Sequence, residues 1–169
     1  HRDRVASVAF CPDGKRVAYS LKKNGRWFLV LDRKERRVRG QPGRVTFSPD
    51  SRRVAYSVYT VGPLSESEQV FIDGLGGARY EYTLDLCFSP DSAHVVYVVR
   101  RGEKWVVVSD GREGKEYDVL RGTVTFSPDG KRVACVAQRG QKRLVILDGV
   151  ENPEYDAIMP GTPVFSPDS

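Results

Sequence analysis

The stretch Phe-Ser-Pro-Asp-Gly-Lys-Arg-Val at residues 126–133 decides the fold, because its first four positions recur along the whole chain. The other copies begin at Phe10 (with Cys in place of Ser), Phe47, Phe88 and Phe165. Successive phenylalanines of the five copies are 37, 41, 38 and 39 residues apart. A repeat of about forty residues is typical of β-propeller blades or of helical arrays.

The residues between the copies favour blades. After the second copy come Val54-Ala55-Tyr56 and Val70-Phe71-Ile72; Asp73 ends the second run, and Tyr80 lies seven residues further on. Short runs rich in β-branched and aromatic residues, separated by Pro, Gly and Asp, predict strands. No window shows a 3.6-residue apolar stripe, which argues against helices. Each unit therefore predicts four strands, and in the first unit Arg39 stands where the others have tyrosine.

We therefore expect an all-β chain of 169 residues that forms one β-propeller or half-propeller domain of four-stranded antiparallel blades. The blades are expected over residues 4–42, 43–83, 84–121 and 122–160. Residues 161–169 repeat the first strand of a blade and predict an extra innermost strand. In the Pro-Asp-Gly turns proline presets φ and aspartate caps neighbouring amides, so these recurring carboxylates are expected to be structural.

The consensus Phe-Ser-Pro-Asp-Gly-Lys-Arg-Val-Ala-Tyr, from which the first copy departs only at Cys11 and the fourth only at Cys135, is followed by a hydrophobic strand that ends in Asp. This pattern resembles the WD40-like (PD40, TolB-type) repeat of bacterial propellers. Similar repeats occur in TolB and in propeller domains attached to prolyl-oligopeptidase-type peptidases. The resemblance covers nearly the whole chain and implies the fold, because propellers serve many functions. No Gly-x-Ser-x-Gly nucleophile elbow accompanies the repeats, so it implies no peptidase activity.

Catalytic and cofactor chemistry has little basis in the sequence. Only His1 and His94 are present, and the three cysteines match no zinc or disulfide pattern. Phosphate-binding glycine motifs are absent. We expect no enzyme, no cofactor and no metal site. No apolar run is long enough to span a membrane. Reduced cysteines favour the cytoplasm, while the resemblance also allows the periplasm.

Charge suggests one candidate binding surface. The net charge is +5, which permits an anionic partner. In up-and-down blades the turns between second and third strands, together with the links between blades, share one face of the disc. We expect that face to be basic, with these candidate residues: Lys22, Lys23, Arg26, Arg39, Arg44, Arg100, Arg101, Lys104, Arg121, Arg139, Lys142 and Arg143.

Ring closure leaves several alternatives open. A blade needs neighbours on both faces, and rings have four to eight blades. The four repeats could close alone, belong to a longer propeller, or pair with a second chain in an eight-bladed homodimer, which we favour. The expected function is a non-enzymatic scaffold for protein or peptide partners. The alternatives are a propeller module of a larger hydrolase, or a basic-face binder of nucleic acid or another polyanion.

Overall fold

The computed structural model describes residues 4–63, 65–159 and 161–168, which form sixteen β-strands and no helix. Four consecutive strands make each blade. Blade 1 contains β1 (Arg4–Phe10), β2 (Val17–Lys23), β3 (Arg26–Leu31) and β4 (Lys34–Val38); blade 2 contains β5 (Gln41–Phe47), β6 (Val54–Val61), β7 (Glu66–Ile72) and β8 (Leu75–Tyr80); blade 3 contains β9 (Tyr82–Phe88), β10 (Val95–Arg101), β11 (Lys104–Ser109) and β12 (Arg112–Tyr117); blade 4 contains β13 (Val119–Phe126), β14 (Val133–Arg139), β15 (Lys142–Leu147) and β16 (Val150–Glu151).

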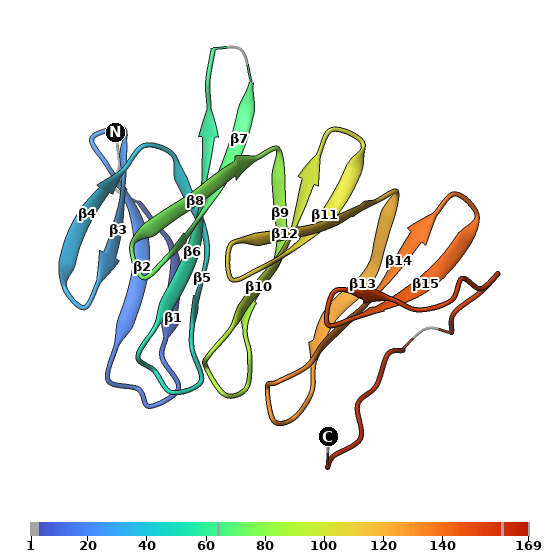
Figure 1. Ribbon diagram of the computed structural model, residues 1–169. Helices are drawn as coiled ribbons and strands as arrows, with labels where there is room; N and C mark the ends of the chain where they lie inside the picture. Colours follow the sequence, from blue (N-terminus) through green and yellow to red (C-terminus); the bar gives the residue numbers. More distant parts are fainter. Residues whose placement is uncertain (1–3, 64, 160, 169) are drawn as a thin grey trace.

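Each blade is an antiparallel sheet whose strands pair in chain order. The four sheets stand side by side, with blade 1 and blade 4 at opposite ends of the row (Figure 1). This arrangement confirms the all-β propeller fold. Residues 161–168 contain no strand, which differs from the extra innermost strand that the fifth copy predicts. The first strand of every other copy pairs with the second strand of its own unit.

The hydrophobic core lies at the seams between blades. Three clusters of buried side chains occupy these seams. Between blades 1 and 2, for example, Leu29 of β3 packs with Phe47, Tyr56 and Val58. This location follows from the alternation of the strands, because each blade has apolar residues on both faces and can cover them only with the adjacent blades.

The recurring Ser-Pro-Asp turn is held by hydrogen bonds within the turn. The Ser48 hydroxyl donates to Asp50 Oδ1 at 2.5 Å and accepts from the Arg53 amide at 2.9 Å. Asp50 Oδ1 also accepts from the amide of Arg52. Asp73, which directly follows β7, accepts from the Val54 amide and the Arg53 side chain. The aspartates of the repeat are therefore structural, as their turn positions predict.

Candidate functional site: the seams between blades

A tyrosine, a glutamate and an arginine meet at the seam between blades 2 and 3 and again between blades 3 and 4. The Tyr80 hydroxyl of β8 donates to Glu113 Oε1 of β12 at 2.8 Å, and Arg101 Nη2 contacts the same carboxylate. At the next seam the Tyr117 hydroxyl donates to Glu151 Oε1 at 2.9 Å, and Arg139 Nη2 lies 2.6 Å from that oxygen. We call this arrangement the seam triad.

The electrostatics of the seam triad follow from these contacts. Hydrogen bonds from Arg139 and Tyr117 lower the pKa of Glu151 to about 2. Bonds from Tyr80 and Arg101 lower the pKa of Glu113 as well. Burial and the bond to a carboxylate raise the pKa of both tyrosines. Each triad therefore holds an ionised carboxylate between a phenol donor and a guanidinium, which ties two blades together.

The first seam lacks all three members of the triad. Strand pairing aligns Trp27↔Val38 with Trp105↔Tyr117, so Val38 occupies the tyrosine position of blade 1. The same strand pairings place Gly76 of blade 2 where blade 3 has Glu113. They place Thr60 of blade 2 where blade 3 has Arg101. Counting seven residues from Asp32 aligns Arg39 with the tyrosines of the other blades. In the structure Arg39 lies one residue beyond Val38, which is the position that aligns with them. The β3–β4 pairing has no bulge, whereas β7–β8 and β11–β12 each have one.

A second contact between blades comes from the turn arginines. Arg16 Nη1 donates to the carbonyl oxygens of Ser51 and Arg52 in blade 2 at 3.0 and 2.8 Å, and its guanidinium lies over the Phe47 ring. Arg53 makes the equivalent contacts with blade 3, to the Ala93 carbonyl and the Phe88 ring. We call this contact the arginine bridge.

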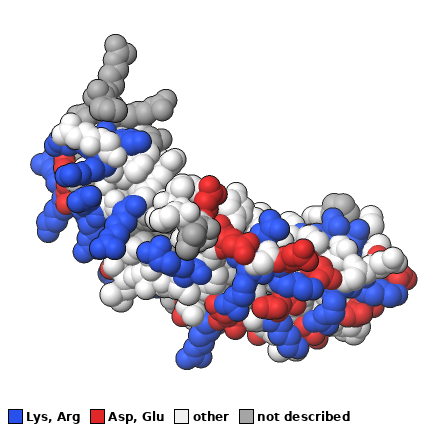
Figure 2. Space-filling view, turned by 90° about the horizontal axis from the view of Figure 1, so that it is seen from above, with Lys and Arg blue, Asp and Glu red and all other residues white. Residues whose placement is uncertain are grey.

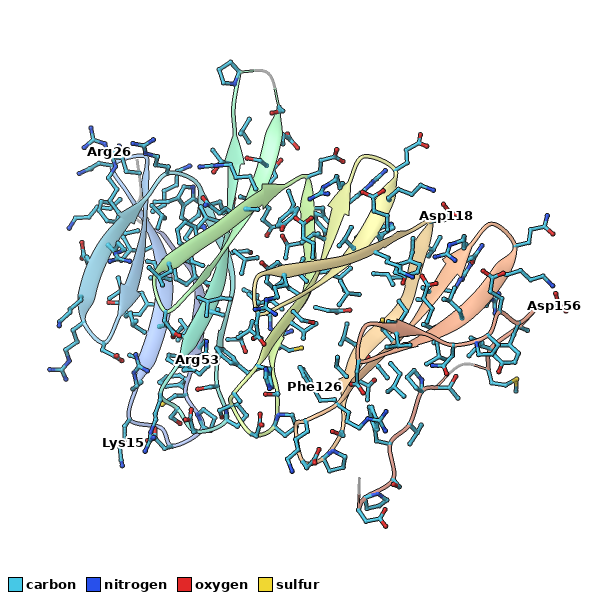
Figure 3. The ribbon with its side chains drawn as sticks, viewed as in Figure 1. Lys15, Arg26, Arg53, Asp118, Phe126 and Asp156 are labelled. Atoms are coloured by element: carbon cyan, nitrogen blue, oxygen red, sulfur yellow. The ribbon has the colours of Figure 1, made fainter. Side chains whose placement is uncertain are left out.

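Blade 3 has His94 in place of the bridging arginine. His94 Nδ1 lies 2.7 Å from Asp110 Oδ2 within its own blade. In the described residues it makes no bond to blade 4, because an imidazole is too short to span the seam. A hollow of about 340 Å³ remains there, lined by His94, Phe126, Arg132 and Cys135 among others. Figure 3 marks Phe126 at this seam.

Blade 1 exposes residues whose counterparts in the other blades are buried or half-buried. Phe10 is 70% exposed, whereas its counterpart Phe47 is 9% exposed. Val8 is 56% exposed, whereas the corresponding Val45 is 7% exposed. Glu35 and Lys23 stand at the glutamate and arginine positions of the seam triad, as the pairings Val30↔Glu35 and Lys23↔Arg26 show. Blade 1 thus exposes the positions that contact the preceding blade at the other seams.

The free face of blade 4 has the matching donors. Tyr155 pairs with Arg143 in an isolated bridge and thereby occupies the tyrosine position of the triad. It is 49% exposed, against 3% for Tyr117. Arg132, the turn arginine of this blade, contacts only its own Asp148 among the described residues. Blade 4 therefore presents a tyrosine and a turn arginine of the kind that contact the next blade at the other seams.

The structure places the candidate basic residues mainly at one edge of the row. Lys22, Lys23 and Arg26 lie at the β2–β3 hairpin, and corresponding sets lie at the β10–β11 hairpin (Arg100, Arg101, Lys104) and the β14–β15 hairpin (Arg139, Lys142, Arg143). Figure 3 shows Arg26 at this edge and Lys15 at the opposite one. Arg44 and Arg121 lie within β5 and β13, and Arg121 Nε donates to Gln138.

Carboxylates of blades 3 and 4 neutralise much of this edge. Lys104 pairs with Asp118, and Lys142 pairs with Asp156 at 2.5 Å. These aspartates follow the outer strands of blades 3 and 4 and lie on the same face as the lysines. Uncompensated positive charge is instead concentrated on blade 1 and its seam with blade 2, which form the blue end of the molecule in Figure 2.

Sequence reasoning missed three arginines of this region. Arg36 and Arg37 belong to β4 and Arg79 to β8, and all three are exposed. They line a hollow of about 310 Å³ at the first seam together with Arg39 and apolar side chains. The run Arg33-Lys34-Glu35-Arg36-Arg37 was the available signal, but it is assigned to the outer strand and not to a turn.

The described residues offer little for metal or thiol chemistry. No group of three or more His, Cys, Asp or Glu side chains within residues 4–63, 65–159 and 161–168 could hold a metal ion. The three cysteines are free. Burial raises the pKa of Cys87 to about 11 and that of Cys135 to about 12. In the described part of the chain no helix qualifies as a membrane span.

Comparison with known proteins supports the fold. No protein-family model and no curated protein sequence matches the chain. Solved structures do. The β-propeller domain of the trilobed protease from Pyrococcus furiosus is 14% identical with a TM-score of 0.59, and the match covers 90% of this chain and 57% of that one. The acylaminoacyl peptidase of Pyrococcus horikoshii is 13% identical with a TM-score of 0.51, over 87% of this chain and 31% of that one.

TolB from Acinetobacter baumannii is 20% identical with a TM-score of 0.43, over 84% of this chain and 40% of that one. The likeness to the two archaeal structures, together with four radially repeated four-stranded sheets, defines a β-propeller. The chain spans a little over half the length of the trilobed-protease propeller domain that it matches.

Proposed function

We propose that the chain is a non-enzymatic propeller scaffold that closes its ring by self-association, with blade 4 of one copy meeting blade 1 of another. The observation that carries this is the complementarity of the two free faces. Blade 4 presents the tyrosine and turn arginine that contact the next blade at the described seams, and blade 1 presents the phenylalanine, glutamate and lysine that would receive them.

The chemistry of the new seam would repeat that of the existing ones. Tyr155 would donate to Glu35 of the second copy, with Lys23 in the place of the triad arginine. Arg132 would lie over Phe10 and bond to turn carbonyls, as Arg16 does at the first seam. Two chains joined at both ends would make a twofold-symmetric eight-bladed ring, whose hairpin edges form a surface for protein or peptide partners.

Sedimentation velocity over a range of concentrations tests self-association. The wild-type chain is expected to sediment as a dimer. Phe10→Lys should weaken the dimer at least about tenfold because it sets a second cation against Arg132 of the other copy, and Glu35→Arg should do the same because it removes the acceptor of Tyr155 and adds a cation beside Lys23. Glu103→Arg, a matched charge reversal at the exposed β10–β11 hairpin, should leave the dimer intact. Wild-type monomers throughout, or equal weakening by Glu103→Arg, would overturn the proposal.

A further inference from the structure

The seam between blades 1 and 2 differs chemically from the other two. Where they have the seam triad, it has Val38, Gly76 and Thr60. Val38 and Thr60 border a hollow of about 310 Å³ at this seam, which is lined by the following residues: Arg36, Arg37, Val38, Arg39, Tyr56, Val58, Thr60, Gln69, Phe71 and Arg79. We call it the first-seam groove.

Positive charge in the first-seam groove is not balanced from within. Four arginines line it, namely Arg36, Arg37, Arg39 and Arg79, and none forms an ion pair with any carboxylate of the described chain. Arg79 makes only a long 3.4 Å contact to the Ser67 hydroxyl. At the other two seams, Arg101 and Arg139 are instead engaged by glutamates. The groove therefore offers several guanidinium groups to an outside anion.

Apolar side chains line the interior of the groove. Tyr56 and Phe71 stack on each other with ring centroids 5.1 Å apart and planes 6° from parallel. Tyr56 and Val58 are buried, and Val38 is half-buried. Because the stacked rings cover each other's faces and Tyr56 is buried, they form no open platform for a nucleobase. An apolar side chain fits the interior better than a flat base does.

We propose that the first-seam groove binds an acidic peptide segment of a partner protein. Side-chain carboxylates of the peptide pair with Arg36, Arg37, Arg39 and Arg79, and one apolar side chain enters the hollow beside Val38. The planar fork of arginine suits this role, because it holds a carboxylate through two parallel hydrogen bonds. This inference deepens the scaffold function proposed above by naming its partner chemistry.

Fluorescence anisotropy with a defined probe tests the proposal. The probe is a short labelled peptide in which glutamates flank one phenylalanine. Arg36→Gln combined with Arg37→Gln should weaken its binding at least about tenfold. Lys15→Gln combined with Arg112→Gln removes the same charge from exposed sites elsewhere and should change binding less than about twofold. Equal loss in both double variants would overturn the proposal.

A second variant tests the groove itself. Thr60→Arg, Val38→Tyr and Gly76→Glu together rebuild the seam triad and should fill the hollow, which abolishes peptide binding. A Cβ at Gly76 would lie 2.8 Å from Gln69 Nε2, so the Gln69 side chain must move, and circular dichroism checks that the variant is folded. Retained binding by this triple variant would contradict the assignment, as would a single-stranded oligonucleotide that binds the wild-type chain more tightly than the peptide. These readouts do not depend on self-association, because the groove lies between two blades of the same chain. Peptide binding by a monomeric chain would support the groove and would contradict only the proposed ring closure.

Discussion

Tyr117 of blade 3 donates a hydrogen bond from its hydroxyl to Glu151 of blade 4 at 2.9 Å, and the same relation joins Tyr80 to Glu113 one seam earlier. Tyr117 is almost fully buried, so its hydroxyl has exchanged water for this carboxylate. The seams of the propeller therefore combine apolar packing with a specific polar contact at their outer side.

Removing the Tyr117 hydroxyl should weaken the last seam. Tyr117→Phe is expected to lower the free energy of unfolding by about 1 kcal/mol, the typical net contribution of a hydrogen bond, because the ring still packs. Urea denaturation measures the change. Tyr82→Phe, at an exposed site of β9, is the control and should be close to neutral. A neutral Tyr117→Phe would show that the bond contributes nothing to the seam.

Acid should destabilise the chain through the same glutamate. The pKa of Glu151 is about 2 in the folded chain against an ordinary 4.5. Between these values the unfolded chain binds a proton that the folded chain does not, so stability is full above about pH 5 and falls as pH drops towards 2. Glu151→Gln should flatten this part of the profile, as measured by denaturation at several pH values. An unchanged slope would contradict the contact.

Replacing His94 should close the third seam. His94→Arg is expected to raise the free energy of unfolding by about 1 kcal/mol, because an arginine can reach across to the turn of blade 4 and lie over Phe126 as Arg16 does over Phe47. Thermal unfolding measures the gain. His94→Lys supplies a charge without the planar fork and should gain less. Equal melting temperatures for the two variants would show that the bridge does not form.

The thiol of Cys135 should be protected in the folded chain. Burial raises its pKa to about 12, so almost no thiolate is present at pH 8. Alkylation by iodoacetamide, followed by peptide mass spectrometry, should label this residue only after denaturant is added. Rapid labelling under native conditions would mean that the seam between blades 3 and 4 opens far more readily than its packing indicates.

Much of this architecture could be predicted from the repeat. The spacing of Phe10, Phe47, Phe88 and Phe126 indicates blades, and the Pro-Asp turns mark their ends. The triad could not be predicted, because its members come from different blades and the bulges of β8 and β12 shift the count by one residue. That shift is why Arg39 and not Val38 is aligned with the tyrosines when residues are simply counted.

The charged surface was harder to predict for a related reason. Net charge can be summed from the sequence, but ion pairs depend on strand boundaries. Lys104 pairs with Asp118 because β12 ends at Tyr117 and leaves Asp118 in the link between blades 3 and 4. The arginines of β4 were missed because an outer strand faces a seam only when the neighbouring blade is in place. Figure 3 shows Asp118 at the same edge of the row as Arg26.

Native mass spectrometry of the wild-type chain at micromolar concentration is the most direct test of the account. Matching faces at the two ends of the row predict a dominant species of twice the 18.9 kDa chain mass. A species of 18.9 kDa alone, unchanged as the concentration is raised, would contradict the claim that blade 4 of one chain completes blade 1 of another.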